Sequence, residues 1–155
     1  MDIRPKPLTV GESAPWFHLP TGSKPRYSFD TAAGRYVLLV FFGSSSNPQA
    51  REVLQRLARL RAVFDDEKVS FFGITTDAED VAEQRVRDAL PGVRFFHDLA
   101  GKVSTLYGAC PPEGGYRPLT YLLDPRLRVL HTMAWTGDPA GQVAQLATML
   151  AALPA

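Results

Sequence analysis

The stretch Tyr36-Val-Leu-Leu-Val-Phe-Phe42 decides the fold, because it is a continuous run of aliphatic and aromatic residues between two glycines. A short apolar run without polar alternation is typical of a strand that is covered on both faces. Directly after it, Ser46 or Asn47 can cap a helix that has Pro48 at its first position. We therefore expect a central strand, a short polar loop and an amphipathic helix.

The rest of the chain continues this alternation of strands and helices. The further elements that we expect are a strand at Val69–Thr75, a helix at Ala78–Leu90, a strand at Val93–Phe96, a helix at Leu99–Tyr107, a loop at Gly108–Tyr116, two hairpin strands at Leu119–Leu123 and Arg128–Met133, and a helix from Asp138 onward. The order β-α-β-α-β-α-β-β-α predicts an α/β domain with one central sheet flanked by helices. Six aromatic residues are expected in the core: Trp16, Phe17, Phe71, Phe72, Phe95 and Phe96.

Length and composition favour one globular domain. The 155 residues fit a single domain over 1–155, in which 1–34 form an N-terminal arm and extension and 35–153 form the core. The formal net charge is +1 and the Lys and Arg residues are scattered, so the pattern favours neither nucleic-acid nor membrane binding. Residues 1–8 carry charges and two prolines instead of an apolar signal core, and we therefore expect a cytoplasmic location.

Two strings resemble signatures of the peroxiredoxins and related redoxins, the alkyl hydroperoxide reductase/thiol-specific antioxidant group. Leu8-Thr-Val-Gly-Glu-Ser-Ala-Pro-Trp-Phe17 is similar to their N-terminal V-G-x-x-A-P-x-F string, and Pro118-Leu-Thr-Tyr-Leu-Leu-Asp-Pro125 to their P-x-T-F-L-I-D-P segment. The resemblance implies a thioredoxin-like fold with a mixed central sheet and an antioxidant, oxidoreductase ancestry. It also implies that Pro118 lies opposite Ser44–Pro48 and is cis, the alternative being a trans proline that begins a strand.

A narrower resemblance concerns the peroxiredoxin-like N-terminal domain of some bacterial 2-oxoglutarate/Fe(II) oxygenases. The residues that carry it are Gly34–Gly43, Asp98, Tyr107-Gly108 and Gly115–Pro118. It implies a fused or separate oxygenase domain as a partner. Because relatives in the wider family often dimerise, a homodimer is also expected.

The family keeps its peroxidatic cysteine in a P-x-x-x-T-x-x-C motif after the central strand, and the matching stretch here is Gly43-Ser-Ser-Ser-Asn-Pro-Gln-Ala50. All three motif positions are changed, and Ala50 stands where the cysteine would be. Alignment with the C-x-x-C motif of thioredoxins places Ser46 and Gln49 at the two cysteine positions instead. A serine hydroxyl is neither as acidic as a thiol nor able to cycle through sulfenic acid, so the resemblance implies a degenerate active site.

This loop is nevertheless the candidate binding site. A helix N-terminus with three hydroxyl groups can hold a small anion, a peroxide or another polar ligand. The alternative is that Ser44–Asn47 only cap the helix and solvate the loop. The candidate binding residues are Gly43, Ser44, Ser45, Ser46, Asn47, Pro48, Arg117 and Pro118.

Cys110 is the one cysteine of the chain and therefore the one residue that could carry thiol catalysis. Arg117 is offset by one residue from an arginine that stabilises the thiolate in the family, and a guanidinium there could lower a thiol pKa. The alternatives are a buried, inert thiol and an arginine that is solvated or paired with Glu113.

We expect no metal and no cofactor. His18, His97 and His131 lie on separate elements, and the glycines form no phosphate-binding pattern. Asp65, Asp66 and Glu67 are expected to form a solvated helix end.

Two functions remain open at this point. The first is a degenerate peroxiredoxin-like domain that binds or docks a partner in redox or oxygenase chemistry. The second is an active thiol peroxidase or thiol oxidoreductase that uses Cys110 alone. The sequence leaves open whether the chain is an enzyme.

Overall fold

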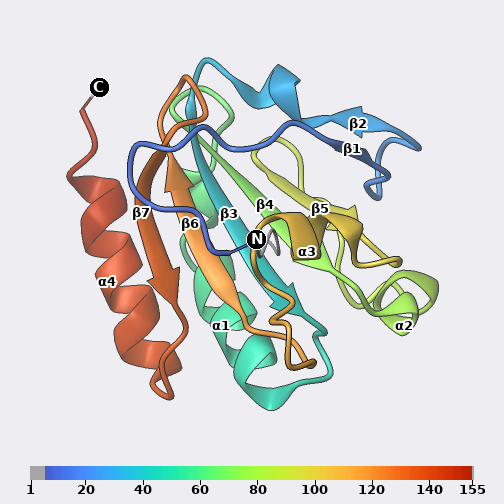
Figure 1. Ribbon diagram of the computed structural model, residues 1–155. Coiled ribbons are helices and arrows are strands. Elements are labelled where there is room, and N and C mark those ends of the chain that lie inside the picture. The colour runs from blue at the N-terminus through green and yellow to red at the C-terminus, as the bar shows by residue number, and fades with distance from the viewer. Residues whose placement is uncertain (1–5, 155) are drawn as a thin grey trace, which may run out of the picture.

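The computed structural model describes residues 6–154 and contains a five-stranded mixed sheet in the order β5-β4-β3-β6-β7 (Figure 1). Its strands are β3 (Tyr36–Gly43), β4 (Val69–Thr75), β5 (Val93–His97), β6 (Leu119–Leu123) and β7 (Val129–Ala134). The central strand β3 pairs in parallel with β4 and in antiparallel with β6. The predicted central strand, the hairpin and the mixed sheet are confirmed.

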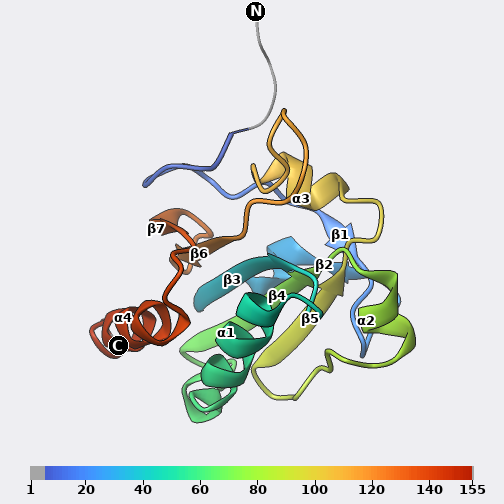
Figure 2. The ribbon, with the colours of Figure 1, turned by 90° about the horizontal axis from the view of Figure 1, so that it is seen from below.

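Helices cover both faces of this sheet. They are α1 (Pro48–Ala58), α2 (Ala78–Ala82), α3 (Lys102–Leu106) and α4 (Pro139–Ala151), with 3-10 turns at Phe29–Ala32 and Arg61–Val63. Figure 2 shows α1 and α4 side by side on one face, and α3 on the other. Alternate residues of β3 serve the two cores: Leu38 and Val40 pack under α1 and α4, whereas Leu39 and Phe41 face the α3 side.

The N-terminal arm lies on the α3 side of the sheet. It contains a small hairpin, β1 (His18–Leu19) paired with β2 (Tyr27–Ser28), and its earlier part hydrogen-bonds to the chain around β7. The prediction of a buried Trp16 is wrong, because this side chain is 72% exposed; the phenylalanines Phe71, Phe72, Phe95 and Phe96 are buried as expected. Residues 1–5 of the predicted arm lie outside the described range.

The second predicted helix is much shorter than expected, because α2 ends at Ala82 rather than at Leu90. Beyond it, Gln84 takes a left-handed conformation with φ of 52°. Asp88 then accepts hydrogen bonds from the backbone N–H of Phe95 (2.9 Å) and from Ser23 (3.1 Å). These long-range contacts override a local sequence of good helix formers.

The third helix is also shorter than predicted, since α3 begins at Lys102. Gly101 before it has φ of 71°, and the buried Asp98 carboxylate accepts the backbone N–H groups of Val103 (3.2 Å) and Ser104 (2.7 Å). Asp98 thus supplies the acceptor that a cap residue would provide. Within residues 6–154, no helix has the length and apolar character needed to cross a membrane.

Candidate functional site

The loop between β3 and α1 is closed by its own helix cap. Asn47 is the N-cap of α1, and its side-chain oxygen accepts the backbone N–H groups of Gln49 (2.9 Å) and Ala50 (3.3 Å). These are two of the free donors that an anion at the helix N-terminus would use. The predicted cap is confirmed at Asn47, and α1 begins at Pro48 as expected.

A buried carboxylate fixes the middle of the loop. Asp80 has no exposed surface, and it accepts hydrogen bonds from the backbone N–H of Ser45 (2.9 Å), the Ser45 hydroxyl and the Thr75 hydroxyl (2.7 Å). Asp80 is not among the predicted site residues, because it falls inside the helix predicted at Ala78–Leu90. The Ser45 hydroxyl is therefore committed to holding the loop in place.

A second carboxylate holds the start of the loop. The Ser44 hydroxyl donates to Asp77 (2.5 Å), which also caps α2 by accepting the backbone N–H of Glu79 (2.9 Å). The hydrogen bond from Ser44 is the main reason why the pKa of Asp77 is lowered. Ser46 is exposed and its hydroxyl lies 2.7 Å from that of Ser44, so Ser46 presents the loop's outermost hydroxyl.

The Arg85 side chain lies close to four acidic side chains around this loop. Its guanidinium lies 2.6 Å from Glu83, 3.1 Å from Glu79 and 3.9 Å from both Asp77 and Asp80. The positive charge of Arg85 is thus compensated by nearby carboxylates. It offsets the cost of burying Asp80, since an unpaired buried charge is strongly destabilising.

An open groove of about 600 Å³ runs from this loop along α1. Its lining residues are Ser45, Ser46, Arg51, Leu54, Gln55, Ala58 and Arg85. Arg51 is exposed and donates to the carbonyl of Ser46 (3.2 Å), which places its guanidinium at the loop end of the groove. The groove combines hydroxyl groups and a cation at one end with an apolar wall farther along the helix.

The position that matches the peroxidatic cysteine holds no reactive group. Ala50 is 1% exposed and packs in the core between α1 and the sheet. At the other aligned positions, Ser46 is exposed and the Gln49 side-chain amide donates to the carbonyl of Thr136. The loop therefore holds no thiol under either alignment.

Tyr116 covers the end of β3 from the other side. Gly43 has φ of 80°, and a Cβ atom added there would lie 3.0 Å from the Tyr116 ring. The Tyr116 hydroxyl lies 3.1 Å from the Ser104 hydroxyl. Burial raises the pKa of Tyr116, and the neighbouring Cys110 thiol adds to this effect. The Gly108–Tyr116 loop thus reaches the start of the serine loop, and it carries a partly exposed Cys110.

Arg117 is turned away from the serine loop. Its guanidinium donates twice to the carbonyl of Gly108, at 2.7 and 3.1 Å. Successive side chains of an extended segment point to opposite faces, so the offset of one residue redirects this arginine. Among residues 6–154, its side chain makes no hydrogen bond to Ser44–Pro48 and no salt bridge to Glu113.

Pro118 lies next to the end of β3 but is not cis. Leu119, the first residue of β6, pairs with Phe41, which places Pro118 close to the start of the serine loop. The cis bond in residues 6–154 is Leu90–Pro91, so the expectation of a cis Pro118 is wrong. The open alternative of a trans proline is confirmed, and Pro118 directly precedes strand β6.

A mixed sheet of this order, with a loop-to-helix site after the central strand, defines a thioredoxin-fold protein of the redoxin class. The AhpC/TSA family model matches residues 10–132. The chain therefore belongs to the AhpC/TSA family, which confirms the peroxiredoxin-like resemblance.

Solved structures agree on the fold. The peroxidoxin BcpB of Mycobacterium tuberculosis has a TM-score of 0.78 at 18% identity, covering 96% of this chain and 99% of that one. Mycobacterium tuberculosis AhpC has a TM-score of 0.73 at 18% identity, with 94% and 93% covered. A putative thiol:disulfide interchange protein DsbE from Chlorobium tepidum has a TM-score of 0.69 at 19% identity, with 92% and 99% covered. No curated protein sequence matches this chain.

Proposed function

We propose that this protein is a degenerate member of its family that binds a partner at the groove along α1 and does not turn over peroxide. The observation that carries this proposal is the buried Ala50 at the position of the peroxidatic cysteine. The two inner serines support it, because Asp77 and Asp80 hold their hydroxyl groups. A binding role uses the shape of the old site without its chemistry.

The groove favours a polar segment of another protein over a small peroxide. Leu54 and Ala58 offer an apolar wall, while Ser46 and Arg51 offer a hydroxyl and a cation at its loop end. A peptide with an acidic side chain followed by a small apolar one matches this order of groups. A free anion is less well served, because Asn47 already occupies donors at the helix N-terminus.

The partner that we propose is a 2-oxoglutarate/Fe(II) oxygenase domain, fused to this chain or separate from it. This step rests on the sequence resemblance alone. A second copy of the chain is the competing occupant of the groove, and a cytoplasmic location is part of the same proposal.

The experiment is co-purification of the protein with an oxygenase from the same genome. Arg51→Glu reverses the charge at the loop end of the groove and is expected to abolish the complex. Arg59→Glu is the matched control, since Arg59 is exposed just after α1 and outside the groove lining. Equal loss in both variants, or a stable homodimer without oxygenase binding, would count against the oxygenase partner.

The second candidate function is a one-cysteine thiol peroxidase, and the place of Cys110 in the loop that carries Tyr116 favours it. In that reaction the Cys110 thiolate would attack the peroxide oxygen and become sulfenic acid, while the peroxide bond breaks and releases an alcohol or water. An external thiol would then reduce the sulfenic acid in two steps. Arg117 gives this reaction little help, because its guanidinium is bound to the Gly108 carbonyl.

A further inference from the structure

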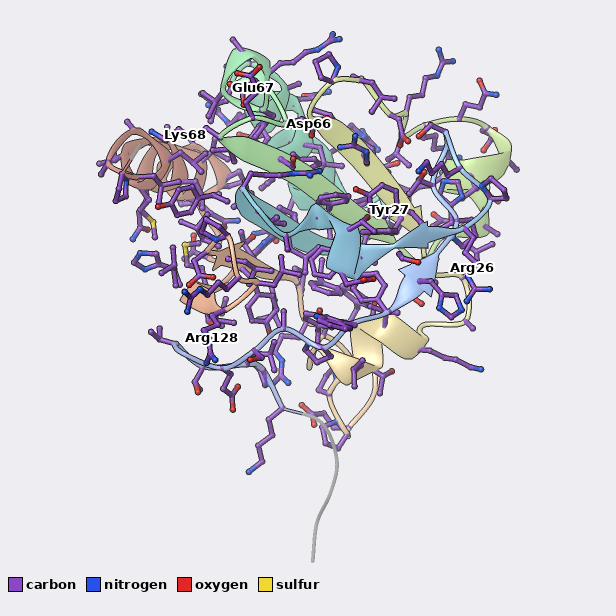
Figure 3. The ribbon with its side chains drawn as sticks, turned by 90° about the horizontal axis from the view of Figure 1, so that it is seen from above. Arg26, Tyr27, Asp66, Glu67, Lys68 and Arg128 are labelled. Atoms are coloured by element: carbon purple, nitrogen blue, oxygen red, sulfur yellow. The ribbon has the colours of Figure 1, made fainter. Side chains whose placement is uncertain are left out.

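A second polar pocket of about 370 Å³ lies at the other end of the molecule, where the β1–β2 hairpin meets the sheet. Tyr27 on β2 and Asp66 in the loop before β4 both line it, and both are seen on the end of the molecule that Figure 3 views from above. Arg35 before β3 and Arg94 on β5 complete its inner wall. The serine loop follows the opposite end of β3, about 25 Å away at the rise of an extended strand.

The lining of this hairpin pocket carries a net positive charge, with Asp88 close by and hydrogen-bonded to Ser23 of the lining. It contains Lys24, Arg35 and Arg94 against a single carboxylate, Asp66. That carboxylate accepts hydrogen bonds from both terminal nitrogens of Arg94 (2.8 and 2.9 Å) and from the Ser70 hydroxyl (2.6 Å). The prediction of a solvated acidic helix end is therefore wrong for Asp66, whose side chain is 22% exposed and fully engaged by Arg94 and Ser70.

Three side chains of the pocket keep N–H or O–H groups that form no hydrogen bond among residues 6–154. Arg35 donates from Nε to Ser70 (2.7 Å), but its terminal nitrogens form no hydrogen bond and its Nη2 lies 3.8 Å from Asp66. The Tyr27 side chain is mostly buried, but its hydroxyl reaches the surface and has no hydrogen-bond partner in that range. Lys24 lies over the Tyr27 ring at 5.5 Å from its centre and has no carboxylate partner in that range.

These donors reach solvent and are free to bind an anion, because among residues 6–154 the buried side-chain atom without a hydrogen-bond partner is Gln142 Nε2. The Arg35 side chain is 17% exposed, and its terminal nitrogens are accessible to a ligand. A guanidinium fork, an ammonium group and a phenol hydroxyl around one cavity match the oxygens of a phosphate group. Leu90, which is 51% exposed at the rim, offers an apolar contact for a carbon group attached to that phosphate.

We propose that the hairpin pocket binds the phosphate group of a small organic phosphate. Arg35 and Lys24 hold the phosphate oxygens, Tyr27 donates its hydroxyl, and Asp66 keeps Arg94 in place. This site is independent of the groove along α1, so either proposal can fail without the other.

The test is a calorimetric titration of the whole protein with phenyl phosphate and with inorganic phosphate at constant ionic strength. We expect saturable binding of both, with phenyl phosphate at least as tight because its ring reaches Leu90. Lys24→Ala should weaken binding about tenfold, the effect of losing one charge contact of roughly 1.4 kcal/mol. Arg35→Met should abolish it.

The matched control is Arg26→Ala, which removes an exposed cation of the same hairpin that reaches His18 rather than the pocket. It should bind phosphate like the unsubstituted protein. If Arg35→Met fails to fold, the comparison of Lys24→Ala with Arg26→Ala decides alone. Absence of saturable binding, equal weakening in Lys24→Ala and Arg26→Ala, or rejection of phenyl phosphate would overturn the proposal.

Discussion

The Tyr116 ring packs directly against Gly43 and leaves no room for a side chain at position 43. A Cβ atom at Gly43 would lie 3.0–3.3 Å from three carbons of the Tyr116 ring, and the φ of 80° already disfavours any other residue. The family motif has a proline at this position. The exchange to glycine thus accompanies a tyrosine that packs on the end of β3, beside the loop where the family keeps its thiol.

Gly43→Ala should destabilise the protein by about 2–3 kcal/mol, since backbone strain and overpacking add. Gly11→Ala is the matched control: Gly11 has φ of 92° but nothing within 4 Å of an added Cβ, so strain alone should cost about 1 kcal/mol. Equal free energies of unfolding for the two variants in urea titrations would show that the contact with Tyr116 is unimportant.

Asp80→Ala should destabilise the protein by about 3 kcal/mol, because the Ser45 and Thr75 groups that donate to this buried carboxylate would lose their acceptor. Glu79→Ala removes an exposed partner of Arg85 and should cost less than about 1 kcal/mol. Amide hydrogen exchange at Ser45 should accelerate only in Asp80→Ala. Unchanged protection there would contradict the role given to Asp80.

Asp66 should make stability depend on pH in the acid range. The hydrogen bonds from Arg94 lower its pKa from 3.8 to about 2, so the carboxylate stabilises the fold above pH 3.8 and this contribution is lost as the pH falls toward 2. Asp66→Asn should be about 2 kcal/mol less stable at neutral pH, and the difference should shrink over that interval. A difference that stays constant from pH 5 to pH 2, which spans the stated interval, would refute this assignment.

Ala50→Cys should fail to restore peroxidase activity. The new thiol would be buried in apolar surroundings, and the arginine that could lower its pKa is bound to the Gly108 carbonyl. Ser46→Cys, at the exposed position of the loop, should react faster with a thiol reagent but should also leave peroxide intact. Peroxide turnover by Ala50→Cys would mean that the family site is still functional apart from its cysteine.

The elements that could be predicted from the sequence are those governed by local pattern. The apolar runs of β3 and β4 and the caps Asn47 and Asp138 define their elements without help from distant residues. The long helix predicted at Ala78–Leu90 failed because Asp88 bonds to Ser23 and Phe95. Those partners are distant in the chain or on another element, so no local pattern could indicate them.

The position of the site could be predicted from the sequence, but its hydrogen bonds could not. The motif placed the serine loop after β3, whereas nothing in the sequence indicated that Asp80 would bind Ser45 or that Arg117 would turn toward Gly108. The core position given to Trp16 failed for a related reason: it lies on the arm, and hydrophobicity alone does not say which face of an irregular segment is covered.

The proposal that this protein does not turn over peroxide can be tested directly. The measurement is the rate of hydrogen peroxide and alkyl hydroperoxide reduction with dithiothreitol, for this protein and for Cys110→Ala. We expect no turnover by either folded protein. Turnover that disappears in Cys110→Ala would contradict the proposal and would place an active thiol site in the Cys110 loop.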